Sequence, residues 1–205
     1  MTRIKCCGMT RVADALLAAQ LGADAIGVVM TSHSKRQVSL AQARAIVDAM
    51  PPFVTTVALC MDDDVEFVRA VVETVRPSLL QFHGSERDEW CAQFDKPYLK
   101  AIAMGEGAAA LLQLRAFPRA VGLLLDGHGL GEAGGSGKTF DWSLMPHDLQ
   151  QPLILAGGLT PLNVQAAIQV ARPWAVDVSS GIESAPGIKE PGKLRDFVSA
   201  VRASS

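Results

Sequence analysis

The sequence has little of what marks secreted, membrane-spanning or nucleic-acid-binding proteins. No apolar stretch typical of a secretion signal follows Met1. The longest apolar runs, such as that from Val121 to Leu125, are far shorter than the roughly 20 residues of a membrane span. Lysine and arginine form no block, and the formal net charge is -2, so binding to a polyanion is not favoured. We therefore expect a cytoplasmic protein that binds neither membranes nor nucleic acid.

The sequence also lacks the cysteine and histidine patterns of disulfide frameworks and metal sites. Its four cysteines contain no C-x-x-C pair, and so few cysteines in a chain of this length make no disulfide framework. No histidine stands four residues from another or at zinc spacing from a cysteine. We expect no bound metal, and we expect Cys60 and Cys91 to be small buried apolar residues.

Short apolar runs alternate with amphipathic segments along the whole chain. Of the 205 residues, 49% are hydrophobic, which suffices for one sizeable core. The runs are short and mostly apolar, as in strands that are covered on both faces. The eight expected strands are Arg3–Cys6, Ala25–Val29, Phe53–Leu59, Leu79–Phe82, Tyr98–Ile102, Val121–Leu125, Leu153–Leu155 and Ala175–Val178.

The segments between these runs have helical spacing and helix-capping residues. Ser39 is placed to cap one helix, and Thr160 is expected to cap another that has Pro161 at its first position. The sixth helix is weak and offers about one turn. The expected helices are Asp14–Leu21, Leu40–Ala49, Val65–Val75, Glu86–Phe94, Ala108–Arg115, Phe140–Leu144, Leu162–Val170 and Gly192–Val201.

Eight successive strand-then-helix units predict a closed parallel barrel. We therefore expect an α/β fold, a (βα)8 TIM barrel that forms a single catalytic domain over residues 1–205. An open doubly wound sheet is the alternative. In a barrel, the residues that follow the carboxyl ends of the strands form the site.

The first strand ends next to a thiol. Strand alternation puts Arg3, Lys5 and Cys7 on one face and Ile4 and Cys6 on the other. Cys7 thus stands at the strand end on the polar face, although a packed thiol is the ordinary alternative.

The sixth strand ends in a carboxylate, Asp126, which precedes Gly127. An Asp before Gly is also common in turns, so this residue by itself fits a loop as well as an acid at the barrel mouth. Together, Cys7 and Asp126 can take a proton from carbon and give one to oxygen.

Glycine-rich loops follow the seventh and eighth strands. These loops form the usual phosphate site of such barrels, because glycines let backbone N–H groups approach an anion. Simple turn glycines are the alternative. The candidate phosphate-binding residues are Gly157, Gly158, Ser180 and Gly181.

Two further side chains follow strands at this end. Arg36 could hold a carboxylate through two parallel hydrogen bonds, whereas an exposed basic pair is usually just solvated. His83 follows the fourth strand and fits a structural donor better than a catalyst.

The glycine-rich stretch from Gly127 to Gly137 matches nucleotide-binding motifs only superficially. No helix opens at Gly129, and the first glycine that a P-loop requires is replaced by Glu132. We expect a mobile loop over the mouth instead.

Seven motifs, in this order, resemble those of the phosphoribosylanthranilate isomerase family of tryptophan biosynthesis. The resemblance covers essentially the whole chain, and the motifs are highly specific only in combination. They are Lys5-Cys-Cys7-Gly8-Met-Thr10, Ser34-Lys-Arg36, Gln81-Phe-His83-Gly84, Asp126, Gly134-Gly-Ser-Gly137-Lys-Thr-Phe-Asp-Trp142, Ala156-Gly-Gly-Leu159-Thr-Pro-Leu-Asn163-Val and Asp177-Val-Ser-Ser-Gly181-Ile-Glu183.

The resemblance implies an Amadori rearrangement of N-(5′-phosphoribosyl)anthranilate to 1-(2-carboxyphenylamino)-1-deoxyribulose 5-phosphate. It implies that Asp126 is the general acid and Cys7 the general base. It further implies that Arg36 holds the anthranilate carboxylate and that His83 and Asp177 bind substrate. No cofactor is implied, because the substrate nitrogen is the electron sink. Because the base must be a thiolate, we expect the site to lower the thiol pKa from its usual value of about 8.5.

Three other functions would each require a different set of residues. A related pentose-phosphate epimerase would need His and Asp metal ligands at several strand ends. The enzyme that closes the indole ring would need a Lys and Glu constellation, which Lys5 alone does not supply. A non-catalytic phosphosugar-binding barrel would need neither Cys7 nor Asp126. The expected partner is a small phosphorylated substrate, and the chain is expected to be a monomer or a homodimer.

Overall fold

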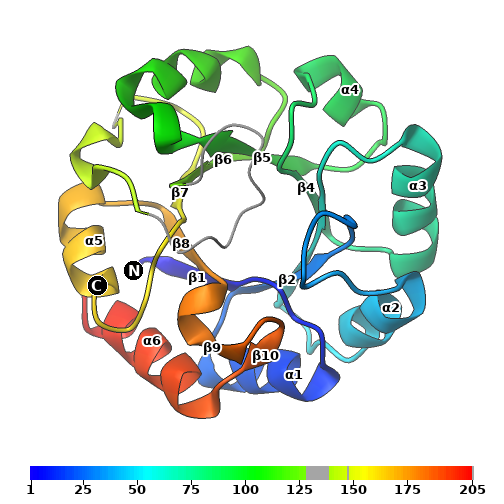
Figure 1. Ribbon diagram of the computed structural model, residues 1–205, viewed down its shortest axis with the longest axis horizontal. Coiled ribbons are helices and arrows are strands. Elements are labelled where there is room, and N and C mark those ends of the chain that lie inside the picture. The colour runs from blue at the N-terminus through cyan, green and yellow to red at the C-terminus, as the bar shows by residue number, and fades with distance from the viewer. Residues whose placement is uncertain (128–138, 147, 205) are drawn as a thin grey trace.

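The computed structural model describes residues 1–127, 139–146 and 148–204. Eight parallel strands close into a barrel in chain order, and β1 pairs with β8 (Figure 1). The strands are β1 (Arg3–Cys6), β2 (Ala25–Val29), β3 (Thr55–Cys60), β4 (Leu79–Phe82), β5 (Tyr98–Ala103), β6 (Gly122–Asp126), β7 (Leu153–Leu155) and β8 (Ala175–Val178). The expected TIM barrel is confirmed, and the open sheet is excluded.

Five strands have the predicted bounds, and three differ by one or two residues at an end. The largest difference is in β3, which begins at Thr55 rather than Phe53. Phe53 has a left-handed φ of 70°, and the N–H of Val54 donates to the carbonyl of Pro51 in a turn. Neither residue can therefore extend the strand.

Helices ring the barrel on its outside, although several are short or irregular (Figure 1). η1 is a π-helix, and η2, η3 and η4 are 3-10 helices. The elements are α1 (Val12–Leu21), α2 (Leu40–Asp48), α3 (Val65–Ala70), η1 (Val71–Val75), α4 (Asp88–Ala92), η2 (Met104–Ala116), η3 (Trp142–Leu144), α5 (Val164–Ala171), η4 (Ser180–Ile182) and α6 (Pro191–Ala203). The weak sixth helix is the single 3-10 turn η3, and the fifth is the 3-10 helix η2, kinked at Gly107.

The expected caps differ in outcome. Ser39 caps α2 in a capping box with Gln42, as predicted. Thr160 does not cap α5, and the prediction that the helix starts with Pro161 is wrong. Asn163 is the N-cap residue. Its side chain accepts from the N–H of Thr160 and donates to the carbonyl of Gly158, which makes the preceding residues a turn.

The hydrophobic core has two layers. The large outer layer lies between sheet and helices and includes Phe82, Tyr98 and Phe197, as well as the buried cysteines Cys60 and Cys91, as expected. A small inner layer fills the barrel with side chains such as Leu99 and Leu124. Burying a large apolar side chain stabilises a fold by about 1.5–3 kcal/mol.

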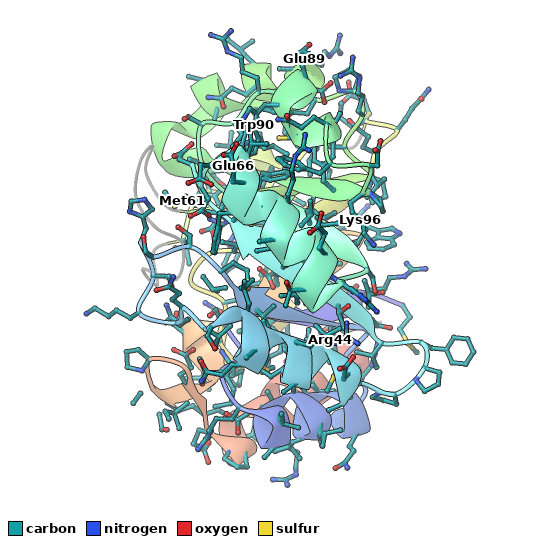
Figure 2. All side chains as sticks on the ribbon, turned by 90° about the vertical axis from the view of Figure 1, so that its right-hand side faces the viewer. Arg44, Met61, Glu66, Glu89, Trp90 and Lys96 are labelled. Carbon is teal, nitrogen blue, oxygen red and sulfur yellow. The ribbon has the colours of Figure 1, made fainter. Side chains whose placement is uncertain are left out.

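The two ends of the barrel are well separated. Figure 2 shows Met61, which follows β3, toward one end and Lys96, which precedes β5, toward the other. The strands all run toward the end of Met61, so their carboxyl ends meet there. Among the described residues, no helix has the length and apolar character to cross a membrane.

A two-stranded antiparallel hairpin, absent from the expected elements, follows β8. It consists of β9 (Glu183–Ala185) and β10 (Ile188–Lys189). The N–H of Glu190 donates to the carbonyl of Ile182, so the hairpin folds back on the end of β8 before α6 begins.

Candidate active site

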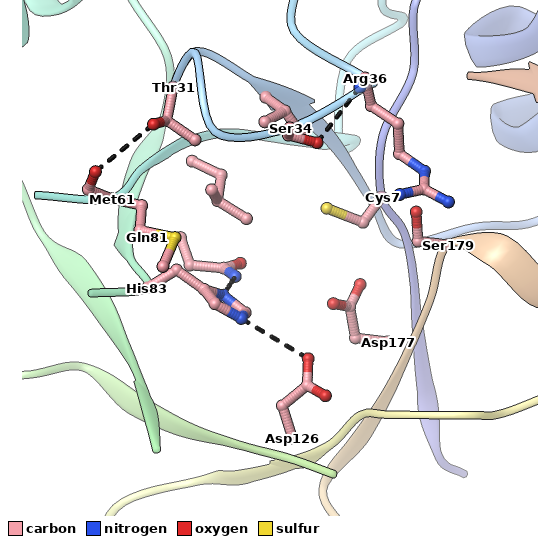
Figure 3. A pocket seen from close by; sticks show the side chains of 12 residues that line it. Cys7, Thr31, Ser34, Arg36, Met61, Gln81, His83, Asp126, Asp177 and Ser179 are labelled. Carbon is pink, nitrogen blue, oxygen red and sulfur yellow. Dashed lines mark hydrogen bonds and ion pairs between the residues drawn. The ribbon is translucent and has the colours of Figure 1, made fainter. Parts of the chain in front are cut away.

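A pocket opens at the carboxyl ends of the strands. It brings together the five side chains that were predicted to form a catalytic and substrate-binding group (Figure 3). Asp126 and Asp177 lie in β6 and β8, whereas Cys7, Arg36 and His83 follow β1, β2 and β4. The lining residues are Cys7, Val29, Thr31, Ser34, Arg36, Leu59, Met61, Gln81, His83, Asp126, Asp177 and Ser179.

Cys7 follows β1 directly and points into this pocket (Figure 3). Its N–H donates to the carbonyl of Val178 over 2.8 Å, which ties it to the end of β8. Cys6 lies in the outer core layer instead, so the predicted strand phase is confirmed. A Cβ at Gly27 would lie 2.7 Å from the sulfur of Cys7. The glycine in β2 therefore makes room for the thiol.

The thiol pKa of Cys7 differs in direction from the expectation. Burial raises it above its usual value, against the pull of Lys5, which lowers it. Lys5 is itself bound to Asp177, with 2.9 Å between Nζ and Oδ1. Because the Asp177 charge offsets the Lys5 charge near the thiol, burial wins. The expected lowering is therefore wrong.

Lys5 and Asp177 face each other across β1 and β8, where they are register partners. Both are almost fully buried inside the barrel. Burial also raises the pKa of Asp177, although the hydrogen bond and charge of Lys5 lower it. In Figure 3 the Asp177 side chain lies between those of Cys7 and Asp126.

Asp126 ends β6 and faces His83 across the pocket. Nε2 of His83 lies 3.6 Å from Oδ2 of Asp126, and Nδ1 of His83 lies 3.0 Å from Nε2 of Gln81. His83 is thus held between a buried amide and the candidate acid. A hydrogen-bonding role for His83, rather than a catalytic one, fits this position.

Arg36 reaches the pocket edge and binds Glu183 with two parallel hydrogen bonds. Nε donates to Oε1 over 2.9 Å and Nη2 to Oε2 over 2.8 Å. The stem of Arg36 passes over Gly8, where a Cβ would lie 2.6 Å from Cδ of Arg36. The two-pronged geometry that was expected toward a substrate carboxylate is thus used on a carboxylate of the protein.

Three of the four candidate phosphate residues line a small cavity next to the pocket. Gly157, Gly158 and Ser180 share this cavity with Asp126 and Asp177. Within the described part of the chain, the N–H groups of Gly157 and Gly158 donate no hydrogen bond. They are therefore available to an anion.

Gly181, the fourth candidate, lies where the two loops meet. It does not line the small cavity. A Cβ there would lie 1.9 Å from the carbonyl oxygen of Leu159, so this glycine lets the loops after β7 and β8 touch.

Several polar residues near the pocket were not among the candidates. Gln81 and Ser179 line it, Lys5 lies beneath Cys7, and Glu183 and Lys189 stand behind Arg36. The alternation that exposed Cys7 also applies to Lys5 and could have identified it. Glu183 belongs to the last of the seven motifs, yet its contact with Arg36 spans 147 positions of the chain and leaves no local pattern.

Two further predictions concern a loop and a metal. The glycine-rich stretch predicted to be a mobile loop lies, except for Gly127, outside the described residues. Within the described ranges, no group of three or more His, Cys, Asp or Glu side chains is placed to hold a metal ion.

The chain is similar to proteins of one family along nearly its whole length. A model of the family N-(5'phosphoribosyl)anthranilate (PRA) isomerase matches residues 4–200. The N-(5'-phosphoribosyl)anthranilate isomerase of Xanthomonas campestris pv. campestris (strain 8004) is 52% identical over 208 residues, covering 98% of this chain and 93% of the relative. That of Nitrosospira multiformis is 50% identical, covering 98% and 97%.

Solved structures give the same picture. Phosphoribosyl anthranilate isomerase from Thermotoga maritima superimposes with a TM-score of 0.88 at 40% identity, covering 99% of this chain and all of that one. A phosphoribosyl anthranilate isomerase in complex with reduced 1-(o-carboxyphenylamino)-1-deoxyribulose 5-phosphate has a TM-score of 0.86 at 37% identity, with coverage of 99% and 100%.

Proposed function

The chain belongs to the N-(5'-phosphoribosyl)anthranilate isomerase family, and from that premise we propose that it isomerises N-(5'-phosphoribosyl)anthranilate. The product is 1-(2-carboxyphenylamino)-1-deoxyribulose 5-phosphate, and the reaction is a step of tryptophan biosynthesis. The observation that carries the proposal is the meeting of Cys7, Asp126 and Arg36 in one pocket of a barrel whose relatives bear this name.

In this proposal Asp126 and Cys7 move one proton each. Asp126 protonates the furanose ring oxygen, and the C1′–O bond breaks to give a Schiff base with the anthranilate nitrogen. Cys7, as thiolate, removes the proton from C2′, and the C2′ electron pair moves toward that nitrogen to form an enolamine. The enolamine becomes the ketone, and proton exchange with water restores the thiolate and the carboxylic acid.

The binding residues divide the substrate between them. We assign the anthranilate carboxylate to Arg36. We assign the sugar hydroxyls to His83, which lies next to Asp126, and to Asp177, which lies between the two proton-transfer groups. The phosphate is assigned to the loops after β7 and β8, where the N–H groups of Gly157 and Gly158 are available. Ser180 lines the same cavity, and we assign Gly181, which lies where the two loops touch, to the same phosphate site.

The raised thiol pKa is compatible with a base. A thiol of higher pKa is the stronger base once it has ionised, and the cations Lys5 and Lys189 both lower the pKa that burial raises. The thiolate that acts on C2′ would therefore be a small fraction of the free enzyme at neutral pH.

A turnover assay tests the proposed function directly. The purified protein is incubated with N-(5'-phosphoribosyl)anthranilate, and loss of the substrate's fluorescence is followed. Turnover in the range of ordinary enzymes, about 1–1000 per second, supports the proposal. Tight binding without turnover would instead support the phosphosugar-binding alternative, and epimerisation of a pentose phosphate would support the epimerase.

The amino ends of the strands favour a homodimer over a monomer. A cavity at that end is lined by Val57, Val121, Ile154 and Trp174, among others, and by the ring of Phe53, which is fully exposed. A protruding ring beside an apolar cavity can be self-complementary about a two-fold axis. A solved structure of monomers generated from the dimeric phosphoribosylanthranilate isomerase of Thermotoga maritima is 36% identical to this chain and covered completely, so a protein of this name is dimeric before it is altered. Sedimentation at several concentrations measures the mass, and a monomer at micromolar concentration would contradict the homodimer.

A further inference from the structure

The β9–β10 hairpin places a buried carboxylate and a buried ammonium behind Arg36. Glu183 binds the guanidinium of Arg36 through both carboxylate oxygens. Lys189 donates from Nζ to Oε1 of the same Glu183 over 2.9 Å. The side chains of Arg36, Glu183 and Lys189 are 11%, 5% and 1% exposed. These three residues, called the Arg36 triad below, therefore form one buried unit at the edge of the pocket.

The Arg36 triad carries a net positive charge. Arg36 and Glu183 alone would cancel, and the pocket would offer no surplus charge to an anionic substrate group. Lys189 supplies the second cation. Burial raises the pKa of Glu183, but its hydrogen bond to Arg36 and the charge of Lys189 together lower that pKa by more. The net shift is therefore downward. Glu183 therefore stays ionised, and the triad has one positive charge in excess. Because the three side chains are buried, water screens this charge only weakly.

The hydrogen bonds of Lys189 prevent it from meeting a ligand itself. An ammonium has three donor positions. Nζ of Lys189 uses them on Glu183, on the carbonyl of Cys7 over 2.6 Å and on the carbonyl of Ser179 over 3.2 Å. Lys189 thus contributes charge to the pocket but no free N–H group.

Arg36 keeps donors for a ligand. A guanidinium has five N–H groups, and the bonds to Glu183 use Nε and one position of Nη2. Nη1 and the other Nη2 position remain, on the edge turned away from Glu183. Gly8 leaves space for the aliphatic part of the Arg36 side chain, and Glu183 binds one edge of its guanidinium. Together they hold the guanidinium in one orientation.

We do not expect the substrate carboxylate to displace Glu183 from Arg36. Its Oε1 also accepts from the N–H of Gly187 over 3.2 Å, and its backbone carbonyl accepts from Nζ of Lys193 over 2.8 Å. Together with Arg36 and Lys189, these donors hold the residue from several directions. Removing it from Arg36 would leave two buried charged groups without their partner.

We propose that Glu183 and Lys189 are positioning residues that give the pocket its preference for a substrate with a carboxylate on the aromatic ring. Glu183 orients the fork of Arg36, and Lys189 keeps the triad positive so that Arg36 attracts a second carboxylate. The inference rests on the proposed function, in which Arg36 meets that carboxylate.

The test compares two substrates that differ only in this group: N-(5'-phosphoribosyl)anthranilate and the same compound made from aniline. The ratio of their kcat/KM values is the carboxylate preference. Arg36→Lys should lower it at least about tenfold, because the two-pronged geometry is lost. Lys189→Met makes the triad neutral and should also lower it at least about tenfold. A loss of general structure would lower both kcat/KM values together and leave the ratio unchanged.

The double variant Glu183→Gln/Lys189→Met separates charge from structure. It removes one charge of each sign, which restores the net positive charge of Arg36. Its carboxylate preference should therefore exceed that of Lys189→Met, although it carries more changes. Equal or lower preference in the double variant would overturn the inference. If Lys189→Met does not fold by circular dichroism, Lys189→Gln takes its place in the same comparison.

The outcomes distinguish this inference from the proposed function. A wild-type protein that turns over neither substrate contradicts the proposed function. Wild-type turnover without a carboxylate preference contradicts the role of Arg36. A wild-type preference that Arg36→Lys abolishes and Lys189→Met retains contradicts only the role of Lys189.

Discussion

The two ends of the barrel are built from the same eight strands but have opposite character. At the carboxyl ends, buried ionisable side chains face one another, among them His83, Asp126 and Asp177. At the amino ends, the cavity is lined mostly by apolar side chains, and Phe53 and Trp174 are exposed. Between the ends, the strands are almost fully buried and most of their side chains are apolar. The apolar core stabilises the barrel as a whole. The fold can therefore hold energetically costly polar groups at the carboxyl ends of its strands.

Buried charged side chains in the barrel are stabilised by ion pairs and hydrogen bonds with one another rather than by contact with water. Lys5 and Asp177 illustrate this, because each would be strongly unfavourable alone in the barrel interior. Removing one partner of such a buried pair typically costs about 3–5 kcal/mol. The difference between the two ends is thus expected to appear as different responses to substitution.

The largest effect is expected from the proposed acid and base. Cys7→Ser replaces a thiol by a hydroxyl that does not ionise near neutral pH, and Asp126→Asn removes the transferable proton. Each should lower kcat by at least about a hundredfold, with KM within a few-fold. Steady-state kinetics on the purified variants measures both constants.

Cys6→Ser is the matched control, because Cys6 lies in the outer core layer. It should lose stability but retain turnover. Catalysis that survives Cys7→Ser but not Cys6→Ser would contradict the assignment of the base.

A smaller loss is expected from Gly27→Ala, which touches no substrate. The added Cβ would lie 2.7 Å from the sulfur of Cys7, so the thiol must move. A misplacement of about 1 Å can cost up to about a hundredfold, so we expect kcat to fall. Overpacking a buried site also destabilises a fold by about 1–3 kcal/mol, so we expect a lower melting temperature as well. Gly192→Ala in the first turn of α6 is the comparison, because its φ is not left-handed and the nearest atom to the added Cβ would be Oε2 of Glu190 at 3.0 Å. Unchanged kcat in Gly27→Ala would contradict the stated position of the thiol.

The ionisation of Cys7 should follow a raised pKa. Alkylation of the thiol needs the thiolate, so its rate should rise about tenfold per pH unit and should still rise above about pH 8.5, where an ordinary thiol is half ionised. The measurement is the iodoacetamide rate at Cys7, read by peptide mass mapping. A rate that levels off below about pH 8 would show that the site lowers the thiol pKa.

Substitutions at the amino ends of the strands should change the oligomeric state but not the turnover number. Phe53→Asp puts a charge on the exposed ring position, and we expect the homodimer to dissociate while kcat per chain stays within a few-fold. Sedimentation and turnover on the same sample test this. Loss of turnover with intact assembly would show that the two ends are not independent.

The sequence predicted the elements best where local pattern decides them. The apolar runs located all eight strands, and the alternation of Lys5, Cys6 and Cys7 gave the correct phase for the thiol. Prediction failed where a tight turn competes with the start of a helix or strand. Asn163 rather than Thr160 is the N-cap residue of α5, and Phe53 lies in a turn that precedes β3.

The sequence by itself determined the barrel, the strand ends that carry its polar residues, and the place of Cys7, Asp126 and Arg36 among them. Periodicity and strand order suffice for this, because parallel strands in chain order bring their carboxyl ends together. The tertiary structure alone decided the partners of these groups. The pairing of Arg36 with Glu183 and Lys189 depends on distances between residues far apart in the chain. So does the raised pKa of Cys7, since the charge of nearby Lys5 is offset by Asp177. Charge and burial act through space, and no local pattern records them.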